Sequence, residues 1–469
     1  MNFVALDLSL LGVFLIFVVT FLIRNKKNLK KSGLLFLYRT KWGMNFIDKT
    51  AKNHPKTLRI FSHVAIWLGY ILMVWMLWLF ARIVWIYLFN PDIVRAIKIP
   101  PIAPLVPYLP QIFKLSFLPP FYFIYWIIII AVIAIPHEFF HGIYMRLYGI
   151  KVKSTGFGFF PFFLPIFMAA FVEQDEKSMV KAKNREQRAV LAAGTFANFL
   201  TAILGLILIA IFFSFSFTAS GVVFDDYAYN IVETSTITML NGIALSNPIY
   251  QEISEIANST SEKNVFKVNE QIYRGIRGAS RDGSKLALYY DSPAINSELY
   301  GPITKINGIQ VKDLDDFSEK MNSFSAGETI KITTNIDNEE TVYELILEEN
   351  PSDGSGWIGI SFFQQSSGVM TKFLTAASFY KDPHIFYQEN FEGAQFIYDL
   401  LWWLIIICFS VALVNMLPMG IFDGGRFFYL TVLKITKSEK IAQKSFKGIT
   451  WFLLALVLLI MIYWGKSFF

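Results

Sequence analysis

The chain has 469 residues, of which 54% are hydrophobic and 17% aromatic, and its mean hydropathy is +0.45. Ordinary soluble domains are about 45–50% apolar, and here the excess is concentrated in long blocks, so the composition excludes a soluble globular protein and predicts a polytopic membrane protein. The formal charge of +6 matters mainly through its distribution, and no nucleic-acid partner is expected. The single cysteine, Cys408, excludes an intrachain disulfide framework or a cysteine-based zinc site.

Six apolar blocks are long enough to cross a lipid bilayer as helices. The first is not expected to be a signal peptide, because it carries Asp7 and its basic residues follow it rather than precede it. The predicted fold class is therefore a polytopic α-helical membrane protein with about six transmembrane helices. The predicted spans are 4–23, 59–90, 121–147, 187–216, 391–418 and 447–465.

Basic residues are unevenly distributed among the segments that connect these spans. Lysine and arginine are frequent in 24–31, 146–188 and 426–447, whereas the loop 91–120 contains three such residues. Because cytoplasmic loops are enriched in lysine and arginine, the three basic segments are predicted to be cytoplasmic and the amino terminus to lie outside.

Two connections are rich in residues that interrupt regular structure. Residues 99–120 include seven prolines, so we expect no regular helix there and a position at the outer membrane interface. Residues 157–171 are apolar but broken by glycine and proline, and they are too short to cross. Irregular backbone at membrane depth requires burial in protein or a cavity, so we predict a re-entrant or β-hairpin element; an interfacial loop is the alternative.

The stretch 218–370 lacks long apolar blocks and is predicted to be an extracytoplasmic α+β domain. Its second half alternates with a period of two, and Asn307-Gly308 is typical of a type I′ hairpin turn. A helix is expected near 313–324, followed by strands at 329–336 and 341–349. Residues 220–290 are poorly patterned and are interpreted as an insertion or a second small module, and the sequon at Asn258 fits an exterior location.

A metal-binding pattern, His137-Glu138-Phe-Phe-His141, follows directly after the apolar run 121–135. On a helix, residues four apart share a face, so both imidazoles can bind one metal ion while Glu138 acts as general base toward its water. The alternative is two histidines hydrogen-bonded within a helix bundle. Ionisable groups inside a span are costly unless they are paired or functional, and the chain has only five histidines, which favours the metal site.

A catalytic zinc usually has three protein ligands and one position open to water. The strongest candidate for the third ligand is Asp423, a carboxylate at the end of the fifth apolar block. We expect Pro418 to end or bend that helix, and Gly424 and Gly425 to free the backbone so that Asp423 can face inward.

These motifs together resemble the site-2 protease family of intramembrane zinc metalloproteases. The matching residues are His137-Glu138-x-x-His141, the segment from Asn415 through Pro418 to Asp423-Gly424, and the Gly-x-x-x-Asn element that ends at Asn198. The segment that begins at Ser292-Pro-Ala resembles a PDZ domain. The resemblance covers about 120–425, and Arg426 stands where many relatives have histidine.

The resemblance implies one Zn²⁺ per chain, bound by His137, His141 and Asp423, with Glu138 activating water. It also implies that Asn198 orients the substrate backbone or the oxyanion, although asparagine in a span is often interhelical glue. Asn415 is expected either to contact the substrate strand or to cap its helix.

The predicted function is cleavage of peptide bonds within or near transmembrane segments of membrane proteins whose ectodomain has already been trimmed. We expect a multi-pass protein of a prokaryotic plasma membrane, with the active site toward the cytoplasm and the PDZ-like domain outside as a docking module, size filter or tether. A catalytically silent zinc-binding scaffold or receptor is the alternative, and an ion transporter is disfavoured because no repeated halves are evident. The oligomeric state is not predicted. The four predicted parts are 1–120, 121–217, 218–370 and 371–469.

Overall fold

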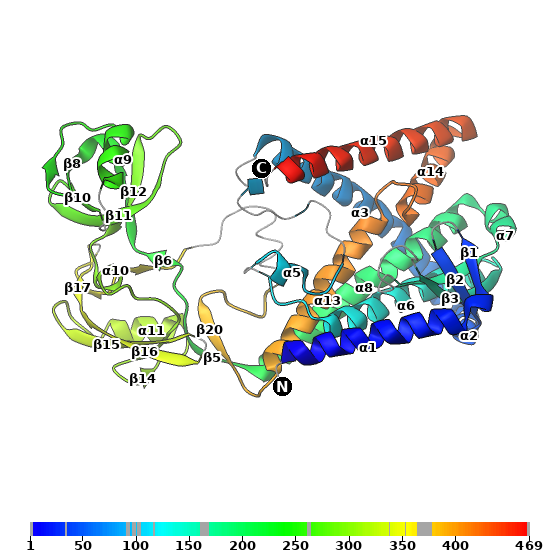
Figure 1. Ribbon diagram of the computed structural model, residues 1–469, viewed down its shortest axis with the longest axis horizontal. Helices are drawn as coiled ribbons and strands as arrows, with labels where there is room; N and C mark the ends of the chain where they lie inside the picture. The colour runs from blue at the N-terminus through cyan, green and yellow to red at the C-terminus, as the bar shows by residue number, and fades with distance from the viewer. Residues whose placement is uncertain are drawn as a thin grey trace. The chain divides into compact units, whose positions relative to one another are not determined.

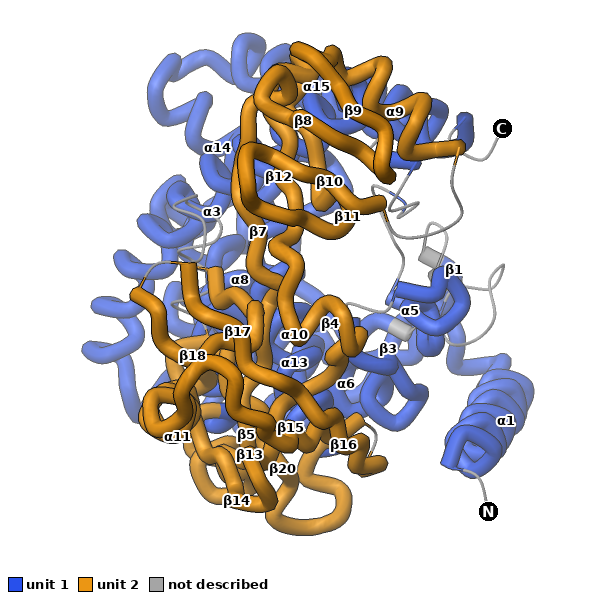
Figure 2. The backbone as a smooth tube through the Cα atoms, turned by 90° about the vertical axis from the view of Figure 1, so that its left-hand side faces the viewer, with its two compact units in different colours: residues 1–209, 396–469 blue, residues 210–395 orange. Residues whose placement is uncertain are grey.

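The computed structural model describes residues 3–32, 35–90, 94–95, 100, 105–115, 118–159, 168–259, 264–336, 338–351, 353–363 and 378–466. The chain divides into two compact units, which Figure 2 shows in different colours. Unit 1 comprises residues 1–209 and 396–469, and unit 2 comprises residues 210–395.

Six helices of the described residues are long and apolar enough to cross a membrane, as the sequence predicts (Figure 1). Their length and composition are consistent with multi-pass membrane insertion, because a helix rises about 1.5 Å per residue and a bilayer core is about 30 Å thick. They are α1 (Phe3–Arg24), α3 (Pro55–Phe89), α6 (Phe123–Leu147), α8 (Asn184–Ser216), α13 (Ala394–Asn415) and α15 (Glu439–Lys466).

The N-terminus of helix α6 is capped by a carboxylate from helix α1. Asp7 of α1 is 1% exposed, and its two oxygens accept hydrogen bonds from the backbone N–H groups of Phe123 (2.7 Å) and Ile124 (3.0 Å). The first N–H groups of a helix have no partner within it, and they carry the positive end of the helix dipole. Asp7 therefore caps α6 in trans, which explains why an acidic residue is tolerated in an apolar span. The Tyr108 hydroxyl donates a third hydrogen bond to Asp7.

The proline-rich segment before α6 is not wholly irregular, because it contains one helical turn, α5 (Leu109–Ile112). The expectation of no regular helix in 99–120 is therefore wrong for these four residues, where Pro110 occupies a position in the first turn that proline tolerates. The carbonyl of Leu105 accepts a hydrogen bond from the indole of Trp126 in α6. This contact holds the described part of the segment against the start of α6.

A four-stranded antiparallel sheet in unit 1 has the strand order β1-β2-β3-β4. The two strands expected from 157–171 are present and paired, so the hairpin prediction is confirmed for the described residues, and its tip, 160–167, lies outside them. The two other strands come from the amino-terminal segment that follows α1, and sequence reasoning did not predict them. The strands are β1 (Leu29–Ser32), β2 (Leu35–Thr40), β3 (Val152–Phe159) and β4 (Met168–Gln174).

The fifth span ends earlier than predicted. Helix α13 stops at Asn415, three residues before Pro418, and a separate helix, α14 (Asp423–Thr436), begins at Asp423. The glycines after Asp423 serve close approach rather than an unusual backbone angle, because an added Cβ at Gly424 would lie 2.4 Å from the Met416 backbone. The chain between the two helices can therefore pack directly on the first turn of α14.

Short elements complete unit 1. Helix α2 (Met44–Asn53) packs against α6, and α7 (Glu176–Lys181) lies between β4 and α8 in the chain. The largest hydrophobic cluster of this unit includes Ile47 of α2, Tyr144 of α6, Ala192 of α8 and Phe427 of α14. The helix that carries the His-Glu-x-x-His motif thus shares a core with α8 and α14.

Unit 2 contains two larger sheets, each with its own hydrophobic core. Residues 220–290, in which the sequence shows little patterning, contribute all strands of a six-stranded antiparallel sheet with order β7-β12-β11-β10-β8-β9, together with helix α9 (Tyr250–Asn258). Its strands are β7 (Tyr229–Glu233), β8 (Ile237–Leu240), β9 (Ile243–Ala244), β10 (Val265–Val268), β11 (Gln271–Ala279) and β12 (Lys285–Tyr290).

The second sheet of unit 2 follows the order β16-β15-β13-β5-β20, with β14 paired to β13. The predicted turn at Asn307-Gly308 is confirmed, since both residues have positive φ (49° and 78°) between β13 and β14. The predicted helix is α11 (Leu314–Met321). The strands are β5 (Phe217–Val222), β13 (Ile303–Ile306), β14 (Ile309–Gln310), β15 (Thr329–Ile336), β16 (Glu339–Ile346) and β20 (Ile385–Glu389).

Replacing Asp7 with leucine is expected to lower the stability of unit 1, because it leaves two N–H groups at the start of α6 without an acceptor. Each unsatisfied buried group costs about 1–3 kcal/mol. The measurement is the apparent unfolding temperature of the purified protein in detergent. The matched control is Ser9→Ala on the same helix, since the Ser9 hydroxyl bonds only the carbonyl of Ala5 one turn earlier. Equal unfolding temperatures for the two variants would contradict the capping role.

Candidate metal centre

Three ligand atoms predicted from distant parts of the sequence converge in unit 1. His137 and His141 lie one turn apart on α6, and their Nε2 atoms are 3.1 Å from each other. Oδ2 of Asp423, the first residue of α14, lies 3.5 Å from Nε2 of His137 and 3.1 Å from Nε2 of His141. Among the described residues, these three form a group that could hold a metal ion.

The spacing of these atoms fits a tetrahedral zinc ion. Ligands about 2.0–2.1 Å from a tetrahedral zinc stand about 3.3 Å apart, and the three observed separations are 3.1, 3.1 and 3.5 Å. Two imidazoles and one carboxylate suit zinc, whereas calcium and magnesium prefer oxygen ligands only. Three protein ligands also leave one tetrahedral position open, as in catalytic rather than structural zinc sites.

Glu138, the predicted general base, is held by the sheet. Its Oε2 accepts a hydrogen bond of 2.8 Å from the backbone N–H of Val172 in β4. A cavity of about 20 Å³ adjoins Glu138 and is lined by residues of α6, β3, β4 and the turn after β2. A cavity of this volume has room for about one water molecule. One carboxylate oxygen is therefore fixed by β4, while the side chain borders a space with room for one water molecule.

An ion pair between Arg39 and Glu173 links strands β2 and β4 next to Glu138. Arg39 of β2 donates two hydrogen bonds to Glu173 of β4 (2.7 and 3.1 Å), and the Ser154 hydroxyl of β3 donates a third (2.5 Å). The Arg39 guanidinium holds the pKa of the Glu173 carboxyl below its usual range. Side chains of β2, β3 and β4 are thus tied together next to the strand that holds the base.

Helix α8 contacts both histidines. The carbonyl of Val190 lies 2.7 Å from Nδ1 of His141, and Nδ2 of Asn198 lies 3.1 Å from Nδ1 of His137. Between them, a Cβ added to Gly194 would lie 2.4–2.5 Å from the Nε2 atoms of both rings. Sequence reasoning named Asn198 but missed Val190 and Gly194, although Gly194 opens the Gly-x-x-x-Asn element.

The remaining predicted residue, Asn415, is the last residue of α13, so it lies near the turn that leads to Asp423. Arg426 is close to Glu176, with 3.5 Å between its Nη1 and the carboxylate.

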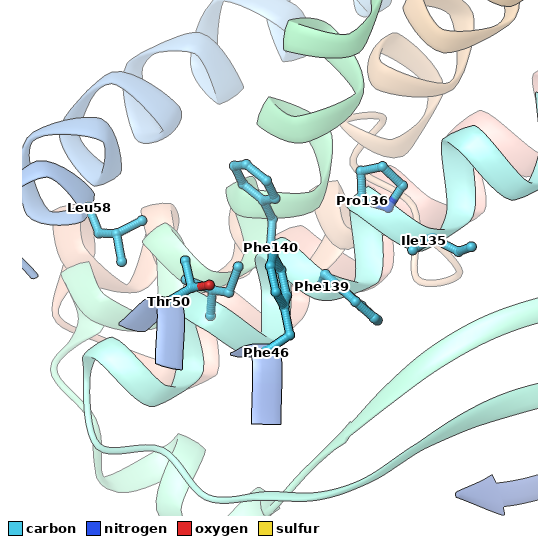
Figure 3. A pocket seen from close by; sticks show the side chains of 8 residues that line it. Phe46, Thr50, Leu58, Ile135, Pro136, Phe139 and Phe140 are labelled. Carbon is cyan, nitrogen blue, oxygen red and sulfur yellow. The ribbon is translucent and has the colours of Figure 1, made fainter. Parts of the chain in front are cut away.

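The two central residues of the motif turn away from the ligands. Phe139 and Phe140 lie on the face of α6 that packs toward α2 and α3, where they line an apolar pocket of about 430 Å³ (Figure 3). Because successive helical residues are about 100° apart, Phe139 lies opposite the face that carries His137 and His141, and Phe140 lies at its flank. The other residues lining the pocket are Phe46, Thr50, Leu58, Ile135, Pro136 and Ile143.

Comparison with known proteins gives one match that covers most of the chain. The model of peptidase family M50 matches residues 125–461, a range that includes all three candidate ligands and Glu138. No curated protein shows significant similarity to the chain. A solved PDZ domain of an SdrC-like protein from Listeria innocua is similar to 17% of this chain and 89% of that domain, at 26% identity and a TM-score of 0.15. That TM-score is too low to establish a PDZ fold here.

Replacing Gly194 with alanine is expected to lower the affinity for Zn²⁺ by at least about 100-fold, because the added methyl group would displace both imidazoles. The measurement is metal content after purification, together with competition against a chelator. The matched control is Gly448→Ala in α15, where an added Cβ meets no atom within 4 Å. Stoichiometric zinc in the Gly194 variant would show that the ligands do not need this close approach.

Proposed function

Because the chain belongs to peptidase family M50, the site-2 protease family, we propose that it is an intramembrane zinc metalloprotease. Its proposed reaction is the hydrolysis of peptide bonds within or near the transmembrane segments of other membrane proteins. The family consists of membrane-embedded metalloproteases that generally depend on zinc.

The observation that carries this proposal is the position of Glu138 relative to the ligand triangle. Glu138 is the neighbour of His137 on α6 and interacts electrostatically with His137, His141 and Asp423. All four residues come from helices of unit 1, whose long members are apolar enough to cross a bilayer. A base beside an open metal position, set among such helices, is suited to hydrolysis in an environment that otherwise excludes water.

A zinc ion held by His137, His141 and Asp423 would supply Lewis-acid polarisation of the scissile carbonyl and would lower the pKa of a water molecule toward about 7. Glu138 accepts the water proton on its carboxylate and later delivers it to the leaving amine. The Val172 N–H, bonded to Oε2 of Glu138, keeps the carboxylate oriented throughout. The ligand atoms belong to His137, His141 and Asp423. Helix α8 packs against the two histidines.

We propose that the substrate is bound as an extra strand on β4. A helical substrate has its amides bonded internally, so it must unwind before cleavage, and its freed N–H and C=O groups then need partners. Strand β4 ends the described sheet, and Val172 directs its N–H away from β3 toward Glu138. Because backbone direction alternates along a strand, Ala170 presents its N–H and C=O to the same edge. Strand addition there would lead the substrate backbone toward the base.

The remaining parts of the proposal concern topology and unit 2. The basic loops support a cytoplasmic active site in a plasma membrane, with unit 2 outside. Residues 385–389, which the sequence assigned to the carboxy-terminal part of the protease core, join the sheet of unit 2 through pairing of β20 with β5. We propose that unit 2 contacts substrates whose ectodomain has been trimmed, either as a filter or as a tether.

Replacing Glu138 with glutamine is expected to abolish cleavage while zinc remains bound, because the base is lost and the ligand set is intact. The assay is co-expression with tagged single-span proteins, scored by fragments released to the cytoplasm, with zinc content measured on the same preparations. Glu176→Gln, an exposed carboxylate change on α7, serves as the matched control. A zinc-binding scaffold without turnover would give no Glu138-dependent fragments.

Replacing Ala170 with proline tests the strand-addition proposal. Proline removes the N–H that faces the free edge but no hydrogen bond to β3, and edge strands tolerate it. We expect at least about tenfold slower cleavage with zinc content unchanged, whereas Ala170→Ser, which keeps the N–H, should cleave like the wild type. Full activity of the proline variant would refute pairing at this edge.

A further inference from the structure

Three residues of α8, spaced one turn apart, face the two imidazoles. Val190, Gly194 and Asn198 occupy positions i, i+4 and i+8, which share one face of a helix. The carbonyl of Val190 lies next to His141, and the amide of Asn198 lies next to His137. Gly194, between them, leaves room for both rings. We term this face the α8 stripe. Its two outer members, Val190 and Asn198, contact the Nδ1 atoms, which the metal would not use, and Gly194 lies against the Nε2 side of both rings.

The stripe determines which ring nitrogen of His141 can bind metal. A neutral imidazole that binds a metal through Nε2 carries its proton on Nδ1, and the partner of Nδ1 must then accept a hydrogen bond. The carbonyl of Val190 can only accept, so Nδ1 of His141 is the protonated nitrogen. The lone pair on Nε2 therefore points toward Asp423.

Asn198 differs from a carbonyl, because an amide has both a donor and an acceptor. As placed, its Nδ2 lies against Nδ1 of His137, and its Oδ1 is buried without a hydrogen-bond partner. That arrangement puts the proton of His137 on Nε2, which lies 3.5 Å from Oδ2 of Asp423. Turning the amide by 180° exchanges its oxygen and nitrogen without moving any other atom. The acceptor then meets Nδ1, and Nε2 is released for the metal.

We propose that Asn198 is a positioning residue that selects the metal-binding tautomer of His137, with its oxygen as the required atom. This inference rests on the proposed function, since it concerns the same metal ligands. It differs from a direct role in catalysis, in which the N–H of Asn198 would donate to the substrate backbone or the oxyanion. The two roles require opposite ends of the same amide.

Two substitutions separate the acceptor from the donor. Asn198→Asp keeps an acceptor next to His137 and removes the donor, whereas Asn198→Leu has a similar volume and removes both. Loss of a hydrogen-bond partner of a metal ligand typically lowers metal affinity about 10–100-fold. We therefore expect the leucine variant to bind Zn²⁺ about 10–100-fold more weakly, and the aspartate variant to bind at least as tightly as the wild type.

The experiment uses the full-length protein in detergent, with Zn²⁺ affinity measured by chelator competition and the visible spectrum of bound Co²⁺ reporting the ligand geometry. Thr201→Val is the matched control on α8, because the Thr201 hydroxyl bonds only the Ala197 carbonyl of its own helix. Control and aspartate variants should keep the wild-type Co²⁺ spectrum, and the leucine variant should not. Cleavage by the aspartate variant should stay within about tenfold of the wild type, consistent with an acceptor role.

Three outcomes would overturn the inference. The first is a leucine variant with wild-type affinity and spectrum, and the second is a folded aspartate variant that no longer binds zinc. The third is an aspartate variant that binds zinc normally but does not cleave, which would assign the amide N–H to the substrate. If the leucine variant does not fold, the aspartate variant alone still decides. Metal affinity is measured without substrate. A wild-type chain without protease activity would therefore refute the proposed function, while the Zn²⁺ affinities of the Asn198 variants would still test this inference.

Discussion

The metal centre depends on three polar atoms being held within 3.5 Å of one another among apolar helices. Without a cation, a carboxylate and two imidazoles in such surroundings would have an uncompensated desolvation cost of several kcal/mol. A divalent ion would offset that cost, since structural zinc sites contribute about 10–16 kcal/mol of binding free energy. Helices α6, α8 and α14, which share a hydrophobic core, each contribute a contact to this small volume, so their packing has to satisfy this requirement.

The sequence predicts most of the centre because its residues occur in compact motifs. His137, Glu138 and His141 are recognisable from helical spacing, and Asp423 stands out as a carboxylate at the end of an apolar block. The six long helices are equally evident from hydropathy. The contributions of main-chain atoms are not evident from the sequence. The Val190 carbonyl and the Val172 N–H are examples, because the identity of the valine side chain does not indicate them. Gly194 is recognisable as the first residue of the Gly-x-x-x-Asn element, but the need for glycine there follows only from its close approach to the two imidazoles.

Long-range pairing explains the other differences between expectation and structure. Strands β1 and β2 are short and flanked by basic residues, so they show little alternation. Strand β2 forms because β3 is available to pair with it, and β1 then pairs with β2. The capping role of Asp7 could not be predicted from its own segment, because the N–H groups that it accepts hydrogen bonds from lie at the start of α6. Strand β20 likewise belongs to unit 2 only through its register with β5. In each case the deciding partner lies more than one hundred residues away in the sequence.

The strand contributed by the amino-terminal region has a consequence for how this protein can be divided. The family match begins at residue 125, yet β2 pairs with β3 from Phe36 to Thr40, and Arg39 holds Glu173. A fragment limited to the shared region would expose an unpaired edge on β3 and lose the cap at the start of α6. The upstream segment is therefore an integral part of unit 1 rather than an accessory extension. The bounds of the family match and the bounds of the folded unit do not coincide in this chain.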